Sequence, residues 1–447
     1  MEINPVKGTH DIYLEEADIY HDIEKCFSEV AMLYNYHEIR TPIIEHTNLF
    51  ARSAGEDSDI VNKEMYTFLD KGGRSITLRP EMTAGVLRSI VSNKLYIAKE
   101  MPVRFFYSGP CFRYERPQAG RYRQFHQFGI ETLGVNTPYN DVEVILMAKQ
   151  MLSMIRLDNV TVKINSLGNE ETRKNYRAAL REYFGGHIEN MCEDCKRRYE
   201  LNPLRILDCK VPNDRPIIEK APVITDFLTP EDKEWLNTVR DMLSDLGVET
   251  VLDTHLVRGL DYYTGVVFEI ASNYKEAPDF GALGGGGHYA HLLKELGGPD
   301  LEGAGFSFGL ERVASLCQII FKEEIEKYQE SLDFYVVGLN DENIQNNFKL
   351  ITSLRLEGFI SDMNYEVKSM KSIFKYASKI GSKFVIIAGD DEMNKGIVRV
   401  KNMLTEEQYD VPYDDQLFAK LHDLMKEYYE KRFNDNSEVE EESGDIN

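Results

Sequence analysis

The chain has 447 residues, 42% of them hydrophobic, and a formal net charge of −23. This length is enough to bury several hydrophobic cores and predicts two or three domains. The acidity argues against a protein whose whole surface attracts nucleic acid, so any such binding must depend on local basic patches. No apolar stretch approaches the about 20 residues of a membrane helix, and the first residues do not resemble a secretion signal. We therefore expect a cytoplasmic protein that does not bind membranes.

The first two thirds of the chain predict one helix followed by several strands. Apolar residues recur at helical spacing within Glu15–Tyr36 and indicate a helix packed on a core. Strand-like runs follow at Ile39–Ile44, Ser75–Leu78, Val103–Ser108, Gln124–Ile130 and Val266–Ile270. Their spacing favours an α+β fold with a mostly antiparallel sheet covered by helices. The polar stretch between Asn169 and Gly247 has few strand signals and predicts a helical insertion.

A predicted hairpin at Phe105–Gly134 carries several arginines in its loop, among them Arg113. Guanidinium groups of this kind suit a polyphosphate. Beyond the loop, strand alternation places Phe125, Gln127 and Glu131 on one face, which predicts a binding surface. An exposed Glu131 paired with a surface lysine is the alternative.

The stretch Leu256–Ile270, LVRGLDYYTGVVFEI, places Arg258, Tyr262 and Tyr263 just before a strand-like run. Such dense polar groups at the start of a strand predict a ligand pocket, and a solvated loop is the alternative.

The segment Gly303–Leu316 predicts a glycine-spaced strand running into an amphipathic helix, with Arg312 near its first turn. A cation at a helix N-terminus opposes the helix dipole. We therefore expect an anionic ligand to hold Arg312, although a carboxylate such as Glu311 is an alternative partner.

From about Ser331 the pattern changes to alternating strands and helices. These are Phe334–Leu339, Asn340–Leu356, Lys383–Gly389 and Leu417–Arg432. The order predicts a small α/β domain containing parallel strands. The last residues, Asn434–Asn447, carry six acids and no base and predict a disordered tail.

Six cysteines are too few for a disulfide framework in a chain of this length. Cys192 and Cys195 form a CxxC pair, and with Cys209 and His187 they are compatible with a zinc site. Cys209 and His187 do not form a second closely spaced pair of ligands, as a zinc site of this type would need. The spacing therefore favours reduced structural thiols and no metal.

Several of these motifs resemble those of class II aminoacyl-tRNA synthetases, and specifically of the histidyl-tRNA synthetases. YHEIRTPIIE (Tyr36–Glu45), FRYERPQAGRYRQFHQ and GFSFGLER are similar to the three class signatures, and LVRGLDYYTG is similar to the histidine-specific element. GTHDI and LRPEMT extend the resemblance, and only the acidic tail falls outside it. The resemblance implies a homodimer with a catalytic domain at 1–328, including the insertion at about 169–247, and an anticodon-binding domain at 331–432, followed by the tail at 434–447.

The resemblance further implies that ATP, with Mg²⁺, activates L-histidine to histidyl-adenylate. The aminoacyl group then passes to the 3′ end of tRNA(His), and AMP and pyrophosphate are released. Three arginines would be catalytic: Arg113 between the carboxylate and the α-phosphate, Arg258 on the α-phosphate, and Arg312 on the γ-phosphate. The implied ATP contacts are Arg113, Glu115, Phe125 and Arg312. The implied histidine contacts are Glu81, Met82, Thr83, Arg113, Gln127, Glu131, Arg258, Tyr262 and Tyr263.

Two features leave alternatives open within this resemblance. Glu81 also fits a simple charge at a helix start. In GGGGHYAH (Gly284–His291), His288 stands where the family usually has an arginine, which puts any ion pair made there in doubt; a histidine at such a position is more often structural than catalytic.

Two relatives of the family do not charge tRNA: a regulatory subunit of ATP phosphoribosyltransferase and a module that senses uncharged tRNA. The regulatory subunit usually lacks the C-terminal domain and the arginines, whereas Arg113, Arg258, Arg312 and the domain after Ser331 are all present here. The sensor module belongs to a much longer chain.

Overall fold

The computed structural model describes residues 3–55, 58, 60–98, 101–118, 120–327 and 332–443. The chain divides into two compact units, Met1–Lys322 and Glu323–Asn447. The sequence predicted a boundary between residues 328 and 331, so the division lies slightly earlier, within helix α12 (Lys322–Lys327). Among the described residues, no helix is both long and apolar enough to cross a membrane.

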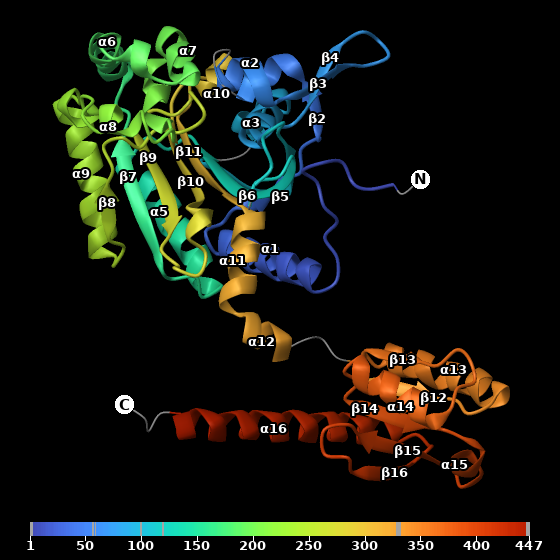
Figure 1. The fold of residues 1–447 in the computed structure, drawn as a ribbon. Coiled ribbons are helices and arrows are strands. Elements are labelled where there is room, and N and C mark those ends of the chain that lie inside the picture. Colours follow the sequence, from blue (N-terminus) through green and yellow to red (C-terminus); the bar gives the residue numbers. More distant parts are fainter. Residues whose placement is uncertain are drawn as a thin grey trace. The chain divides into compact units, whose positions relative to one another are not determined.

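The first unit is built on an eight-stranded sheet (Figure 1). Its spatial order is β1 (His37–Glu38), β5 (Val103–Phe112), β6 (Gln124–Leu133), β11 (Gly303–Gly309), β10 (Ala282–Tyr289), β9 (Val266–Ser272), β7 (Val160–Ser166) and β8 (Thr250–Leu252). All neighbouring strands are antiparallel except the pairs at the two edges, β1–β5 and β7–β8. The predicted α+β class and mostly antiparallel sheet are confirmed.

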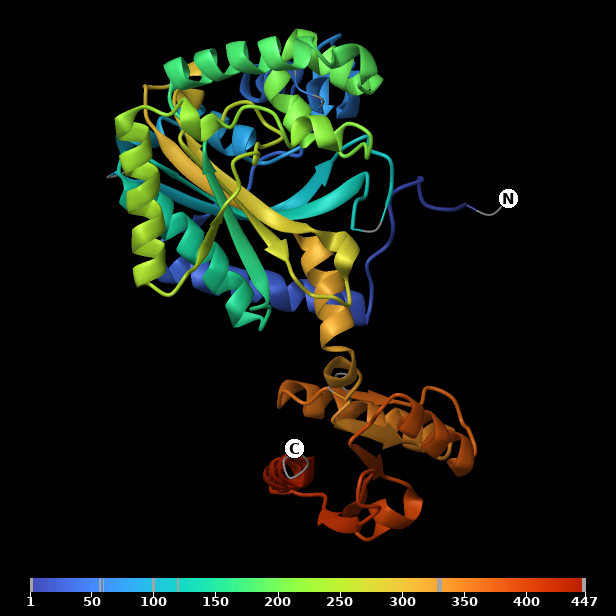
Figure 2. The same cartoon turned by 60° about the vertical axis from the view of Figure 1, so that its left-hand side comes forward.

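One face of this sheet is covered by helices that include α1 (Glu15–Leu33), α5 (Pro138–Met154) and α11 (Leu310–Ile320) (Figure 2). The apolar stripe of α1 faces the sheet, where the ring of Phe27 lies 5.4 Å from those of Phe128 and Phe308. These side chains belong to the largest buried cluster of the chain. Helix α1 therefore forms for the reason that its periodicity indicated, which is burial of one face.

A smaller, three-stranded sheet lies apart from the main one, in the order β2 (Ile44–His46), β4 (Ser75–Leu78), β3 (Tyr66–Leu69). The predicted strand Ile39–Ile44 is wrong, because β1 ends at Glu38 and β2 begins only at Ile44. Pro42 lies in the gap and cannot donate a ladder hydrogen bond. Further short elements of the first unit are α2 (Thr47–Ala54), η1 (Ile60–Glu64), α3 (Thr83–Ser92), α4 (Leu95–Ala98), η5 (Pro278–Phe280) and α10 (Leu292–Glu295).

The predicted helical insertion is confirmed. Its elements are α6 (Glu170–Gly185), η2 (Ile188–Asn190), α7 (Glu193–Leu201), η3 (Pro203–Asp208), α8 (Arg215–Ile218), η4 (Ile224–Asp226) and α9 (Pro230–Asp245). The side chain of Asn169 accepts a hydrogen bond from the N–H of Thr172 and caps α6, and Thr229 caps α9 in the same way through Asp232. Pro230 occupies the first turn of α9, where its missing N–H costs nothing.

The second unit holds a five-stranded sheet in the order β13 (Ser361–Met363), β12 (Phe334–Val337), β14 (Phe384–Ile387), β15 (Ile397–Asn402), β16 (Gln408–Pro412). Strand β12 is parallel to both of its neighbours, and the other pairs are antiparallel, as a small α/β domain with parallel strands predicts. Its helices are α13 (Asp341–Leu356), α14 (Met370–Lys379), α15 (Asp390–Asn394) and α16 (Leu417–Ser443). The tail predicted to be disordered from Asn434 instead continues α16 to Ser443; the last four residues lie outside the described part.

Candidate active site

A cavity of about 730 Å³ opens in the first unit. It gathers the side chains of all three predicted motifs, although they are up to about two hundred residues apart in the sequence. The predicted site residues that line it are Glu81, Thr83, Arg113, Glu115, Phe125, Gln127, Glu131, Arg258, Tyr262, Tyr263 and Arg312. The strand β6 and the loop before β9 thus present their polar faces to one space.

Met82 is the predicted contact that does not line this cavity. Its side chain is only 1% exposed and packs among Val86, Leu87 and Tyr107 in the second buried cluster. Met82 precedes the first turn of α3, between two residues that face the cavity. Its side chain therefore supports the wall from behind.

Glu131 lies at the closed end of the cavity and is 2% exposed. Its Oε1 accepts hydrogen bonds from the hydroxyls of Thr83 (2.7 Å) and Tyr107 (3.1 Å), and its Oε2 accepts one from Tyr289 (2.8 Å). Burial raises the pKa of Glu131 to about 8 despite these three donors. The alternative of an exposed Glu131 paired with a surface lysine is wrong.

Glu81 accepts hydrogen bonds from the backbone N–H groups of Thr83 (2.7 Å) and Ala84 (2.9 Å). It therefore does cap the start of α3, as the simpler interpretation held, and it also lines the cavity. Burial raises the pKa of Glu81, an effect that the two N–H donors and Arg113 oppose. Both roles are compatible, because a capped carboxylate keeps lone pairs for a ligand.

The alternation predicted for β6 is confirmed. Phe125, Gln127 and Glu131 face the cavity, whereas Phe128 and Ile130 are buried in the core under α1. Gln127 is held in place from both sides: its Oε1 accepts from the thiol of Cys111 (3.3 Å), and its Nε2 donates to Ser307 (3.4 Å).

The stretch before β9 contributes two tyrosines and an arginine, so the interpretation as a merely solvated loop is wrong. The rings of Tyr262 and Tyr263 lie 4.6 Å apart and both are buried. Arg258 donates to Oε2 of Glu269 over 3.3 Å, beside the glycine strand β10. A side chain at Gly285 would come within 2.9 Å of the Arg258 guanidinium, so glycine there leaves the space that Arg258 needs.

The hairpin between β5 and β6 places Arg113 at the mouth of the cavity. Its Nε donates to the carbonyl oxygen of Pro80 (2.8 Å), and its guanidinium lies 5.1 Å from the centre of the Phe125 ring. Glu115 lies between two cations, 3.8 Å from Arg113 and 3.4 Å from Arg121. The arrangement holds Arg113 in a fixed direction while one of its terminal nitrogens stays available to an anion.

The side chains of Arg312 and Glu311, in the first turn of α11, contact different partners. Both oxygens of Glu311 accept from the backbone N–H of His126 (2.7 and 2.9 Å), so Glu311 is not the partner of Arg312. Arg312 instead donates to the carbonyl oxygens of Gly120 and Ala282 and lines the cavity. Within the described part of the chain no carboxylate forms a direct ion pair with it, although Glu115 and Glu269 lie near enough to favour its charged form.

His288 retains an ion pair despite standing where an arginine is usual. Its Nε2 lies 2.7 Å from Glu302 and its Nδ1 lies 3.2 Å from Asp141, and the side chain is buried. Burial lowers the pKa of His288, but the two carboxylates outweigh this effect and raise it to about 10. The doubt about this position is resolved in favour of a structural imidazolium.

Sequence reasoning missed the wall contributed by the insertion. Its cavity-lining residues are Leu207, Asp208, Lys210, Arg215, Ile218 and Glu219. No local pattern marks them, because they approach the sheet only through the packing of η3 and α8. The sequence also did not reveal Tyr107 and Tyr289, whose hydroxyls donate to Glu131. Strand alternation was the available signal for Tyr289, because it places this residue on the same face of its strand as Gly287.

Comparisons with known proteins place the chain in a family. The sequence model of the family described as "Histidyl-tRNA synthetase" matches residues 8–313, and that described as "Anticodon binding domain" matches residues 333–423. A protein named "Histidine--tRNA ligase" from Geobacillus sp. strain WCH70 is 45% identical over 91% of this chain and 96% of its own length. The protein of that name from Bacillus subtilis strain 168 is 44% identical over 93% and 97%.

Among solved structures, the apo histidyl-tRNA synthetase of S. aureus is similar to this chain with a TM-score of 0.76 and 38% identity. The match covers 94% of this chain and 99% of that one. The sequence identity to these proteins extends over both units, so it includes the motifs of the first unit as well as the C-terminal domain. The chain therefore belongs to the histidyl-tRNA synthetase family.

Proposed function

We propose that this chain joins L-histidine to the 3′ end of tRNA(His) in two steps, through histidyl-adenylate. The observation that carries the proposal is one cavity lined both by buried carboxylates and tyrosines and by the three arginines assigned to catalysis: Glu81, Glu131, Tyr262, Tyr263, Arg113, Arg258 and Arg312. Such a cavity suits a small amino acid bound next to a polyphosphate.

The carboxylates and tyrosines of the cavity are suited to histidine. Glu81, Thr83 and Gln127 offer acceptor oxygens for the ammonium group, and Glu131 and Tyr263 offer one partner for each imidazole nitrogen. An imidazole nitrogen left unpaired in this buried space would cost roughly 1–3 kcal/mol. An amino acid of similar size without two ring nitrogens would leave these groups unpaired, which is a basis for specificity.

The arginines of the cavity are suited to ATP. In the first step an oxygen of the histidine carboxylate attacks the α-phosphorus, the bond to the bridging oxygen breaks, and pyrophosphate leaves. Arg113 and Arg258 would offset the charge where the two anions meet, and Arg312 would bind the γ-phosphate. Phe125 offers an aromatic surface for adenine and Glu115 a polar contact.

In the second step a ribose hydroxyl at the 3′ end of the tRNA attacks the carbonyl carbon of the adenylate. The hydroxyl proton passes to the phosphate of the departing AMP, and the histidyl ester remains on the tRNA. The groups that held the carboxylate and α-phosphate in the first step hold the same atoms in the second, so one site serves both.

Mg²⁺ fits this site as a companion of ATP. Glu115 and Glu269 both line the cavity and offer the carboxylate oxygens that Mg²⁺ binds. Each lies beside an arginine assigned to the phosphates, Glu115 beside Arg113 and Glu269 beside Arg258. When bound, the ion would neutralise charge on the departing pyrophosphate.

The second unit supports recognition of the anticodon. On α14 and just before it, Lys368, Lys371, Lys375 and Lys379 are exposed and repeat at helical spacing, opposite the buried Ile373 and Ala377. Lys383, the next lysine along the chain, is instead buried and pairs with Asp333 at 2.6 Å. The remaining stripe gives an acidic chain the local positive surface that binding to a phosphate backbone requires.

We propose a homodimer that works in the cytoplasm. The segment Tyr36–Glu45, which resembles the first class signature, exposes Ile43 (40%) and Ile44 (49%). Adjacent exposed aliphatic side chains of this kind indicate a surface that another protein covers. The six cysteines, all within the described part of the chain, form no disulfide, which agrees with a reducing compartment.

The two alternatives without charging activity are not favoured. The regulatory subunit usually lacks a C-terminal domain, but this chain has one at residues 333–423. Arg113, Arg258 and Arg312 all line the cavity, whereas they would have no function in a protein that does not activate an amino acid.

Charging of tRNA with labelled histidine tests the proposal. The purified chain, incubated with ATP, Mg²⁺ and bacterial tRNA, should form acid-precipitable histidyl-tRNA that mild alkali hydrolyses. A regulatory or sensor protein would form none, even at stoichiometric enzyme concentration.

A further inference from the structure

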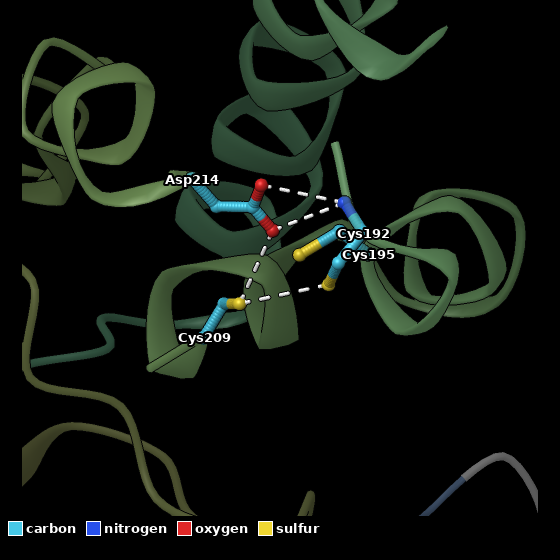
Figure 3. A group of neighbouring side chains, drawn as sticks. All are labelled: Cys192, Cys195, Cys209 and Asp214. Atoms are coloured by element: carbon cyan, nitrogen blue, oxygen red, sulfur yellow. Dashed lines mark hydrogen bonds between the residues drawn. The ribbon is translucent and has the colours of Figure 1, made fainter. Parts of the chain in front are cut away.

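Four potential metal ligands converge in the helical insertion, away from the groups assigned to catalysis. Figure 3 shows Cys192, Cys195, Cys209 and Asp214 directed toward one another. Their ligand atoms, one from each residue, all lie within 4.8 Å of one another. They come from three elements: the start of α7, the end of η3 and the start of α8.

Two of the distances between these atoms match those of a tetrahedral zinc site. With Zn–S near 2.3 Å and Zn–O near 2.0 Å, tetrahedral geometry places two sulfurs about 3.8 Å apart and a sulfur and an oxygen about 3.5 Å apart. The sulfurs of Cys192 and Cys209 are 3.8 Å apart, and the Cys209 sulfur is 3.4 Å from Oδ2 of Asp214. The group is thus arranged as ligands around one small ion.

Asp214 provides an independent observation. Its side chain is 1% exposed, and within the described part of the chain it pairs with no lysine, arginine or histidine. Its contacts are the backbone N–H of Cys192 and the Cys209 thiol. Buried charges in proteins are either paired or bound to a metal, so this carboxylate calls for a cation.

The N–H of Cys192 also fixes the direction of the Asp214 carboxylate, as hydrogen-bond donors to metal ligands do. Around the cluster the packing is apolar, with Met191, Ile206 and Ile218 in the same buried group as Cys195 and Cys209. Four protein ligands in a dry surrounding describe a closed, structural site and leave no position for a substrate.

The cluster differs from the zinc site considered from the sequence, where reduced thiols without a metal were favoured. His187 is not part of the cluster; its ring packs 5.1 Å from that of Tyr183. The fourth ligand is Asp214, which completes the spacing C-x2-C-x13-C-x4-D. The second pair that the sequence lacked is therefore a cysteine and an aspartate.

We propose that Cys192, Cys195, Cys209 and Asp214 bind one structural Zn²⁺ that ties α7, η3 and α8 together. The ion would hold one wall of the active-site cavity, because Leu207 and Lys210 flank Cys209 and Arg215 follows Asp214, and all three line that cavity. This inference stands without the proposed function, since the ligands touch neither histidine nor ATP in that scheme.

Zinc content of the full chain, purified without chelators or an affinity metal, tests the proposal. Atomic emission should find about one zinc per chain. C209S and C195S should lower the content at least tenfold, whereas the control C26S, which alters a cysteine on α1, should retain it. D214C should also retain zinc, because thiolate replaces carboxylate as a ligand, and D214A should lose most of it.

A second measurement does not depend on how the variants fold. The unaltered chain, loaded with Co²⁺ in place of Zn²⁺, should show the intense visible bands of tetrahedral cobalt and the near-ultraviolet bands of thiolate ligands. Weak octahedral bands, a metal-free protein with freely titratable thiols, a Cys192–Cys209 disulfide, or zinc that persists in C209S and C195S would each overturn the assignment.

Discussion

The hydroxyl of Tyr289, on β10, donates a hydrogen bond to Oε2 of Glu131, on β6, over 2.8 Å. Strand β11 lies between these two strands, and Gly305 is the residue of β11 that pairs with Glu131. A Cβ atom at Gly305 would lie 2.2 Å from Oε2 of Glu131. The contact across the intervening strand therefore exists only because position 305 has no side chain.

Gly305→Ala should accordingly displace Glu131 and weaken histidine binding by at least tenfold. The new methyl group would also meet the carbonyl oxygen of Ile130 at 2.4 Å, so the melting temperature should fall as well. Isothermal titration with histidine and a thermal melt measure both effects. Gly309→Ala, on the same strand with nothing within 4 Å, should melt like the parent; equal destabilisation by both would contradict the steric argument.

Glu131→Gln keeps the size of the side chain but removes a group that can gain and lose a proton. It should weaken histidine binding by roughly 1–3 kcal/mol and leave ATP binding nearly unchanged, because only the imidazole loses its partner. Equilibrium binding of each substrate measures the two effects. If the variant binds histidine like the parent, Glu131 does not contact the imidazole.

Histidine affinity should also show a maximum with pH. Free imidazole has a pKa near 6.5 and Glu131 a pKa of about 8, so between these pH values the free imidazole is neutral and Glu131 holds one proton. A hydrogen bond between Glu131 and the imidazole also contains one proton, so in this range binding neither releases nor takes up a proton. At lower pH binding must release a proton and at higher pH it must take one up, so the affinity falls on both sides. Glu131→Gln should lose the alkaline decline; an unchanged profile would argue against Glu131 as its source.

Arg258→Ala should slow adenylate formation by at least ~10²-fold while histidine binding changes far less. The reason is that Arg258 faces the position assigned to the α-phosphate, where charge builds up only in the transition state. Stopped-flow measurement of the first turnover separates the rate from binding. Equal losses in the two would show that Arg258 serves ordinary substrate binding instead.

His288 makes the unfolding free energy depend on pH. Its pKa in the folded protein, about 10, lies above the ordinary value of 6.5, so its contribution is complete below about 6.5 and is lost as pH rises through 10. His288→Gln should cost roughly 3–5 kcal/mol near pH 7, because it leaves Asp141 and Glu302 without their cation. His288→Arg should retain most of the stability. Denaturant melts at pH 7 and 10 test this, and equal losses in both variants would contradict it.

Reversal of charge on α14 should impair the charging of tRNA without affecting the formation of histidyl-adenylate. Lys371→Glu combined with Lys375→Glu should lower tRNA charging by at least tenfold and increase its sensitivity to salt, while histidyl-adenylate forms at the parental rate. Lys349→Glu, an exposed change on α13, is the matched control. Normal charging by the double variant would place the anticodon contacts elsewhere in the chain.

The parts of the site that follow strand or helix periodicity could be predicted from sequence. Alternation along β6 placed Gln127 and Glu131 on one face, and the start of α11 placed Arg312 at the cavity. Contacts between distant segments could not be predicted in this way. Asp214 joins the cysteine cluster only through the packing of η3 against α7 and α8, and Met82 turns away from the cavity although both of its neighbours face it.

The central claim is that this cavity activates histidine, and amino-acid-dependent exchange of pyrophosphate into ATP tests it most directly. With each of the twenty amino acids in turn, we predict exchange with L-histidine and none above background with the other nineteen. Exchange that is absent with histidine, or that is faster with another amino acid, would contradict the account.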